Sequence, residues 1–273
     1  MRIGIVGAGP SGSYLALLLA RGGARPVLFH DPEAGEKPCG GGVTAKAFDE
    51  FPELSGLSIP SVRVDRARIV SPRGRAVEIE SDRMFEIFSR ETFDGTLREL
   101  AGAAGARIVP SRVARVGPGP RVGFDGGEES FDLLVGADGA SSLVGRSSGR
   151  ALPKARLCPA VGVLVRGVDP GEGAWMRFYP GIRGYLWVFP RVDRASVGIV
   201  AFPGDATAAD LRRRVAEFLR GSLPRAQVVG SYGWVIPATG ADGRPLVPAL
   251  EDRVALVGDA AGLVDPITGE GIY

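Results

Sequence analysis

The stretch Ile3-Gly4-Ile5-Val6-Gly7-Ala8-Gly9-Pro10-Ser11-Gly12 decides the fold of this chain. Residues 2–6, apolar from Ile3 onward, predict a buried strand, and a mostly apolar stretch from Ser13 to about Arg21 predicts a helix. The Gly-x-Gly-x-x-Gly pattern between them is typical of a turn that binds a dinucleotide.

Each glycine of this turn has its own physical task. Gly7 permits the tight turn, Gly9 lets the backbone approach a pyrophosphate, and Gly12 lets the helix pack closely against the strand. The helix N-terminus, which includes Ser11, attracts the phosphate charge.

Asp31 completes the pattern. Residues 26–29 predict a second buried strand, and Asp31 follows it at the spacing expected of an acid that binds ribose hydroxyls. Strand, helix and strand together predict the opening β-α-β unit of a parallel sheet. This motif alone does not distinguish FAD from NAD.

Composition bounds the class of protein. The chain has 273 residues, which suits one large domain or a cofactor domain with a smaller one inserted. The 41 glycines stand in short clusters, which favours tight turns and close approach of backbone to a ligand. The net charge is +2 with both signs interspersed, so no nucleic-acid partner is expected. The run 212–214, three arginines on a predicted helix, leaves a solvated face or a lipid-headgroup contact open.

Cysteine and histidine usage excludes other chemistries. Cys39 and Cys158 have neither metal-ligand spacing nor a disulfide framework, and His30 is the only histidine, so we expect no metal site and no catalytic triad. No stretch reaches the roughly 18 apolar residues of a membrane span, and no signal peptide is recognised. We therefore expect a cytoplasmic protein, with peripheral membrane contact left open.

Two later turns place acids at strand ends. Residues 132–142 contain a strand that runs into Gly136-Ala137-Asp138-Gly139, and residues 256–261 contain another that ends at Gly258-Asp259. Asp138 and Asp259 can accept hydrogen bonds from ribitol or ribose hydroxyls. In this order the three motifs resemble the FAD-dependent monooxygenase and reductase superfamily typified by aromatic hydroxylases, which implies that the cofactor is FAD.

Three segments narrow the resemblance. Residues 36–43 (Glu-Lys-Pro-Cys-Gly-Gly-Gly-Val), 185–190 (Tyr-Leu-Trp-Val-Phe-Pro) and 258–273 are similar to the Cys-Gly loop, the Tyr-x-Trp-x-Phe-Pro segment and the C-terminal flavin segment of the geranylgeranyl reductase family. That family uses reduced FAD to saturate isoprenoid double bonds. The resemblance covers essentially the whole chain.

The resemblance implies a fold of class α/β. A Rossmann-like, FAD-binding parallel sheet with a three-stranded crossover β-sheet is expected over 1–60, 85–157 and 235–273. An antiparallel-sheet substrate domain (α+β) with one helix at about residues 207–220 is expected over 61–84 and 158–234. Relatives continue past Tyr273, so we expect a C-terminal helical part to be missing.

The resemblance also assigns roles to residues. Gly12 and Asp31 would hold the ADP half, with Val113 on the adenine side, and Asp259 would bind ribitol. The backbone N–H groups of Gly271 and Ile272 would face the flavin pyrimidine. The other expected cofactor contacts are Gly7, Gly9, Ser11, Cys39, Gly40, Gly42, Arg90 and Asp138.

Several residues keep two interpretations. Cys39 is either a proton donor beside the flavin or a small residue that packs against the ring. Tyr185, Trp187 and Phe189 alternate along a strand and so share one face, which is either a hydrophobic core or an apolar wall that guides a prenyl chain. Arg90 either contacts the cofactor or only begins a helix.

The expected function is reduction of carbon–carbon double bonds in a geranylgeranyl-type isoprenoid lipid by hydride from reduced FAD. The alternative is an FAD-dependent monooxygenase that hydroxylates or epoxidises an apolar substrate. A third hypothesis is a remnant that binds flavin or lipid without turnover. No second Gly-rich dinucleotide domain is recognised, so NADPH binding transiently, or a ferredoxin, is expected as electron donor. The oligomeric state is not predicted.

Overall fold

The computed structural model describes residues 1–169, 171, 173–238, 246–248, 250–265 and 268–272. The chain folds into two compact units. Unit 1 comprises Met1–Lys37, Glu91–Arg156 and Pro237–Ile272, and unit 2 comprises Pro38–Arg90 and Leu157–Ile236. The chain therefore leaves unit 1 and returns to it twice.

Unit 1 contains the parallel sheet that the opening motif predicts. The strands of unit 1, which form this sheet and a second, smaller one, are β1 (Ile3–Val6), β2 (Val27–His30), β6 (Arg107–Pro110), β7 (Val113–Gly117), β8 (Arg121–Phe124), β9 (Gly127–Ser130), β10 (Leu133–Gly136), β16 (Leu250–Glu251) and β17 (Val254–Leu256). Its helices are α1 (Pro10–Arg21), α4 (Arg90–Ala103, whose first residue belongs to unit 2), α5 (Leu143–Ser147), η1 (Lys154–Arg156) and η3 (Gly258–Ala261).

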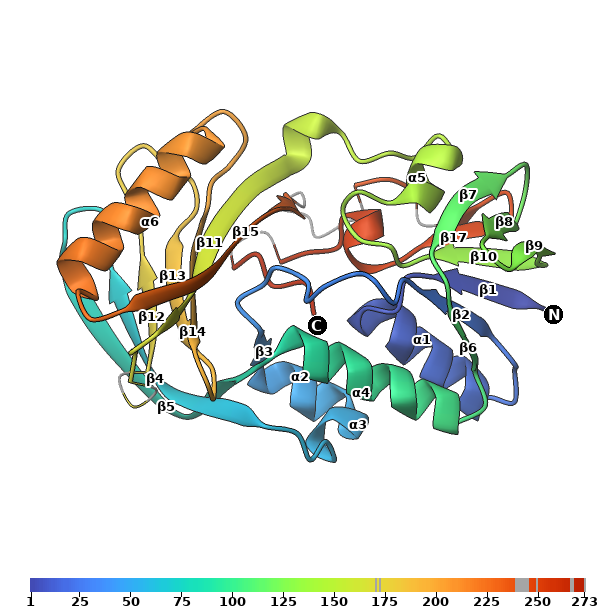
Figure 1. Ribbon diagram of the computed structural model, residues 1–273, viewed down its shortest axis with the longest axis horizontal. Helices are drawn as coiled ribbons and strands as arrows, with labels where there is room; N and C mark the ends of the chain where they lie inside the picture. The colour runs from blue at the N-terminus through green and yellow to red at the C-terminus, as the bar shows by residue number, and fades with distance from the viewer. Residues whose placement is uncertain (170, 172, 239–245, 249, 266–267, 273) are drawn as a thin grey trace. The chain divides into compact units, whose positions relative to one another are not determined.

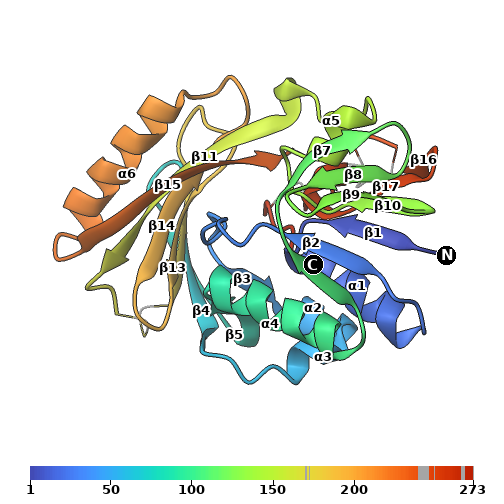
Figure 2. The same cartoon turned by 45° about the vertical axis from the view of Figure 1, so that its right-hand side comes forward.

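The main sheet of unit 1 has the order β16-β17-β10-β1-β2-β6, with β16 as its antiparallel edge. All four residues of β1 are buried, as expected for a central parallel strand covered on both faces. One face packs against α1 and α4 through an apolar cluster that includes Leu17, Leu28 and Ala101. The other face packs against the antiparallel sheet β7-β8-β9 and α5, with Phe29, Val122 and Val144 in the cluster (Figure 2). The predicted three-stranded crossover sheet is thus confirmed.

Unit 2 is built on a larger, mostly antiparallel sheet. Its elements are β3 (Gly42–Thr44), α2 (Ala45–Glu50), α3 (Pro52–Ser55), β4 (Ser61–Val70), β5 (Ala76–Phe88), β11 (Leu157–Arg166), β12 (Ala174–Arg177), β13 (Leu186–Pro190), β14 (Ala195–Val200), α6 (Ala208–Ser222) and β15 (Gln227–Pro237). The strand order is β15-β11-β14-β13-β12-β4-β5-β3, and β4 and β12 pair in parallel.

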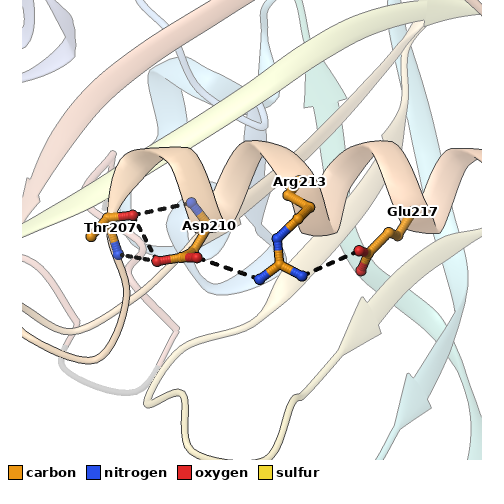
Figure 3. A network of polar contacts seen from close by, with 4 residues as sticks. All are labelled: Thr207, Asp210, Arg213 and Glu217. Atoms are coloured by element: carbon orange, nitrogen blue, oxygen red, sulfur yellow. Dashed lines mark hydrogen bonds and ion pairs between the residues drawn. The ribbon is translucent and has the colours of Figure 1, made fainter.

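Helix α6 covers one face of this sheet, as the orange helix in Figure 1 shows. Leu211, Val215 and Phe218 of α6 pack on a cluster that includes Val188 and Val197. A capping box starts the helix: the Asp210 N–H donates to Thr207 Oγ1 over 3.2 Å, and the Thr207 N–H donates to Asp210 Oδ2 over 3.2 Å (Figure 3).

Arg213 extends the same polar row along α6. It lies 3.4 Å from the carboxylates of both Asp210 and Glu217 (Figure 3). The middle arginine of the run 212–214 is therefore exposed and ion-paired along the helix, and a lipid-headgroup contact of this run stays a prediction.

The boundaries of the units differ from the predicted domains. Residues 38–60 and 85–90, assigned by sequence to the cofactor domain, lie in unit 2. The cause is strand pairing: β5 continues to Phe88, beyond the predicted domain boundary at residue 84, and β3 pairs with its second half through Gly42 opposite Ile87. The assignment of these segments to cofactor or substrate binding stays a prediction.

None of the helices in the described ranges has the length and apolar character needed to cross a bilayer.

Candidate cofactor and substrate site

The glycine turn after β1 is shaped by close contacts. A Cβ on Gly12 would lie 1.9 Å from the carbonyl oxygen of Gly7. Gly7 has a positive φ of +102°, and a Cβ on it would lie 2.4 Å from the carbonyl oxygen of Ala137. A Cβ on Gly9 would meet only Asp94 Oδ2 at 4.0 Å. Gly7 and Gly12 are therefore required by packing, whereas Gly9 borders open space.

The N-terminus of α1 has no side-chain cap. Pro10 occupies the first turn, and the Ser13 N–H is already bonded to the Gly9 carbonyl oxygen at 2.9 Å. The third motif lies directly beside this end, since a Cβ on Gly258 would meet Ser11 Oγ at 2.3 Å. An uncapped helix end with small residues around it suits a phosphate group.

Asp31 follows β2, where the ribose ligand was predicted. Its Oδ1 accepts the Glu33 N–H at 3.0 Å, and its Oδ2 lies 3.8 Å from Nε of the exposed Arg112. The neighbouring His30 has a lowered pKa, chiefly because burial disfavours its charged form and secondarily because of Arg98. His30 is therefore uncharged at neutral pH.

Asp259 lies in a polar cluster within unit 1. Lys37 Nζ is 2.8 Å from its Oδ2, and a Cβ on Gly271 would lie 2.9 Å from its Oδ1. The structure thus brings together Asp259 and Gly271, two of the predicted cofactor residues. It adds Lys37, which sequence reasoning did not select; a lone cation inside a Gly/Pro-rich loop was the available signal.

Asp138 is committed to local structure. Its Oδ2 accepts the N–H groups of Leu143 (2.6 Å) and Val144 (3.1 Å) at the start of α5, and its Oδ1 accepts the Ser142 hydroxyl. The carboxylate therefore caps a helix, which the sequence interpretation had not considered. Cofactor binding by Asp138 stays a prediction.

Ile272 and Val113 also have structural partners. The Ile272 N–H donates to Glu270 Oε1 at 2.8 Å, so this predicted flavin donor has a side-chain acceptor in this structure. Val113 is buried in the cluster between the two sheets of unit 1 and pairs with Phe124 across the small sheet.

The Cys39 loop is packed within unit 2. The Gly41 N–H donates to Cys39 Sγ at 3.3 Å, and Gly41 has φ +85°. A Cβ on Gly40 would meet the Phe189 ring at 2.3 Å, and one on Gly41 would meet the Phe88 carbonyl oxygen at 2.2 Å. A Cβ on Gly42 would make only ordinary contacts with Phe85 and Phe189. The glycines thus let the loop lie flat on Phe189.

The aromatic residues 185, 187 and 189 share the sheet face opposite α6, as predicted. The ring centroids of Tyr185 and Trp187 lie 6.2 Å apart, and those of Phe189 and Phe85 lie 5.4 Å apart. Trp187, however, is only 5% exposed, and its indole N–H donates to Ser196 Oγ at 3.1 Å. Tyr185 and Phe189 are more open, so they are the better candidates for an apolar wall.

A buried cation follows this strand. Arg191 is 3% exposed, and its Nη2 donates to the Cys39 carbonyl oxygen at 2.9 Å. Arg90, the predicted cofactor contact at the start of α4, is buried as well, with 2% exposure. Arg191, Ser196 and Tyr232 were missed by sequence reasoning; the lone hydroxyl of Ser196 in an otherwise apolar strand was the signal for a buried polar network.

No group of acidic, histidine or cysteine side chains in the described ranges could hold a metal ion. The fold and this arrangement of glycines and acids are those expected of a Rossmann-type dinucleotide-binding protein. The geranylgeranyl bacteriochlorophyll reductase-like protein of Thermoplasma acidophilum has a similar structure, with a TM-score of 0.85, 26% identity and coverage of 99% of this chain and 74% of that one. A flavin-dependent brominase shares the fold, with a TM-score of 0.79, 17% identity and coverage of 99% and 75%.

No family model matches the chain. Digeranylgeranylglycerophospholipid reductase 1 of Methanococcoides burtonii is 31% identical over 98% of this chain and 70% of its own length. Geranylgeranyl diphosphate reductase of Synechocystis is 29% identical over 100% of this chain and 72% of its own length. The chain belongs to the geranylgeranyl reductase family, as its Cys-Gly loop and aromatic strand had indicated, and it is an oxidoreductase.

Proposed function

We propose that the chain reduces carbon–carbon double bonds of a geranylgeranyl-type isoprenoid lipid and that FAD is its cofactor. The observation that carries the proposal is the alignment of 98% of the chain with a digeranylgeranylglycerophospholipid reductase at 31% identity. A geranylgeranyl chain is apolar and contains several isolated double bonds.

The residues of unit 1 fit FAD. Gly9 borders open space beside an uncapped helix N-terminus, where a pyrophosphate can approach backbone amides. Gly7, Ser11 and Gly12 would hold that pyrophosphate, Asp31 the ribose and Asp259 the ribitol. Val113, Gly271 and Ile272 would contribute backbone groups, and Ile272 would first have to release Glu270.

Residues of unit 2 can contact an apolar substrate and donate a proton to it. Tyr185 and Phe189 offer aromatic surface along which a prenyl chain can lie. Reduced FAD, when bound, supplies the hydride. Cys39 Sγ would give a proton to the second alkene carbon and regain one from water, so that each bond gains two hydrogens. Gly40, Gly42 and Arg90 are further proposed cofactor contacts.

The electron donor and the cellular place follow from the same proposal. NADPH that binds transiently, or a ferredoxin, would reduce the FAD. The enzyme would work in the cytoplasm and contact the membrane surface peripherally, because its substrates partition into lipid.

Anaerobic turnover tests the function. The protein is loaded with FAD, reduced with dithionite, and mixed with geranylgeranyl diphosphate or a digeranylgeranyl glycerophospholipid. The expected result is flavin reoxidation without oxygen and a product heavier by two hydrogens per bond. Reoxidation that requires oxygen, with one oxygen atom gained by the product, would replace the proposal with the monooxygenase. Protein that binds FAD but turns over neither way would leave a non-catalytic binder.

A further inference from the structure

Two donors meet at the carbonyl oxygen of Cys39. Arg191 Nη2 lies 2.9 Å from it, and Ser196 Oγ lies 3.3 Å from it. A carbonyl oxygen has two lone pairs, so these two hydrogen bonds saturate it. Both donors are buried, with Arg191 3% and Ser196 0% exposed.

Ser196 has a single consistent pattern of hydrogen bonds. Its oxygen lies 3.1 Å from Trp187 Nε1, which can only donate, and 2.6 Å from the Tyr232 hydroxyl. A serine hydroxyl donates one hydrogen bond and accepts two. If it donates to Cys39, it must accept from both Trp187 and Tyr232. The Tyr232 hydroxyl is protonated at neutral pH and can donate, and burial raises its pKa further, to about 12.

The sheet makes room for these two donors. A Cβ on Gly162 would lie 2.4 Å from the Tyr232 hydroxyl oxygen, and one on Gly198 would lie 2.2 Å from Trp187 Cζ2. Both glycines stand in strand interiors, β11 and β14, where glycine weakens a strand. Their presence there is explained by the large rings above them.

We propose that Arg191, which follows β13, and Ser196, in β14, are positioning residues. Their hydrogen bonds fix the Cys39 peptide and thereby the direction of its thiol. Trp187 and Tyr232 support Ser196. The consequence for turnover rests on the proposed function; the anchoring of the loop does not.

Because the Arg191 bond is charge-assisted, its loss should release the loop. We expect Arg191→Met to raise the rate of Cys39 alkylation by iodoacetamide about tenfold. A hydrogen bond to a charged group shifts an equilibrium by about that factor or more, so its loss should favour the released loop to the same extent. Arg191→Lys keeps a cationic donor and should recover most of the wild-type rate. Ser196→Ala should raise the rate by about three- to fivefold.

The two cysteines make the measurement self-controlled. Alkylation is resolved by peptide mass spectrometry on the whole protein, and Cys158, which is buried at 7% exposure, reports on global unfolding. Arg166→Met, an exposed arginine at the end of β11, is the matched control and should leave both rates unchanged. Equal Cys39 rates in wild type, Arg191→Met and Ser196→Ala, with Cys158 protected, would overturn the proposal. If Cys158 became reactive in Arg191→Met, Ser196→Ala alone would decide.

Turnover gives an independent arm. Arg191→Met should lower kcat about tenfold with less than a twofold change in KM, and the loss should vanish in a Cys39→Ala background, because Arg191 acts through Cys39. A kcat loss of the same size in both backgrounds would assign Arg191 to another task. If the wild type showed no reductase activity, the proposed function would fail, while the alkylation rates would still test the anchoring.

Discussion

Lys37 Nζ and Asp259 Oδ2 lie 2.8 Å apart although 222 residues separate them in the sequence. The side chains are 31% and 14% exposed, so the ion pair is partly shielded from water. Asp259 is the predicted ribitol ligand, and it therefore has a counter-charge. If Asp259 binds the ribitol as proposed, this counter-charge would offset the repulsion between the carboxylate and the pyrophosphate of an approaching FAD.

Removal of Lys37 should weaken FAD binding. In Lys37→Met the charge of Asp259 is uncompensated, and we expect the Kd of FAD to rise by about three- to tenfold at low ionic strength, and less at 1 M salt, where charges are screened within about 3 Å. Fluorescence titration of FAD at both salt concentrations measures this. Lys37→Arg keeps the cation and should bind nearly as wild type. Tighter binding by Lys37→Met would mean that the ion pair competes with the cofactor.

Gly9 and Gly12 should separate binding from folding. A Cβ at position 9 has its nearest neighbour at 4.0 Å, so Gly9→Ala should fold with a loss of stability of about 1 kcal/mol or less. It should bind FAD at least tenfold more weakly, because its methyl group fills the space beside the helix N-terminus. Ala at Gly12 would clash with the Gly7 carbonyl oxygen at 1.9 Å, so Gly12→Ala should lose several kcal/mol of stability, roughly 3 or more.

Urea unfolding and FAD titration on the same samples check both variants. A Gly9→Ala protein with wild-type affinity for FAD would place the pyrophosphate elsewhere.

Asp138 should contribute to stability more than to binding. Asp138→Ala leaves the N–H groups of Leu143 and Val144 without their acceptor, which should lower the free energy of unfolding by about 1–2 kcal/mol. We expect the Kd of FAD for the folded protein to change less than about threefold. Ser142→Ala, which removes a partner of Asp138 and the cap of Gly145, should resemble it in stability. A tenfold loss of FAD affinity with little loss of stability would instead make Asp138 a cofactor ligand.

The sequence was most informative where the pattern is local. The strand, glycine turn and acid around Gly7 and Asp31 predicted the parallel sheet, because hydrophobic periodicity and turn geometry are determined by residues close together in the sequence. The pairing of Lys37 with Asp259 could not be predicted, since it depends on how two distant turns meet. Arg191 was missed because a charged residue just after a strand ordinarily faces water. Asp138 could have been recognised, since an acid before a short helix is a common cap.

Tyr232 should make stability fall at alkaline pH. Burial, ahead of every other cause, raises its pKa from 10.0 to about 12. A tyrosine is neutral when protonated, so the raised pKa means that the folded state holds a proton that the unfolded state releases from about pH 10. The stabilisation is therefore fully present below pH 10 and is lost as the pH rises to about 12. The loss should be of the order of 2 kcal/mol over that window.

Two variants isolate this titration. Tyr232→Phe removes both the ionisable group and the 2.6 Å hydrogen bond to Ser196, so it should be about 1 kcal/mol less stable than wild type at pH 8 and lose less stability between pH 10 and 12. Trp187→Phe removes another donor to Ser196 but no titratable group, so its stability should fall with pH as steeply as that of the wild type. Urea unfolding at pH 8, 10, 11 and 12 gives the three curves. Parallel curves for wild type and Tyr232→Phe would mean that Tyr232 ionises as readily in the folded protein as in the unfolded chain, and that its hydroxyl is open to water.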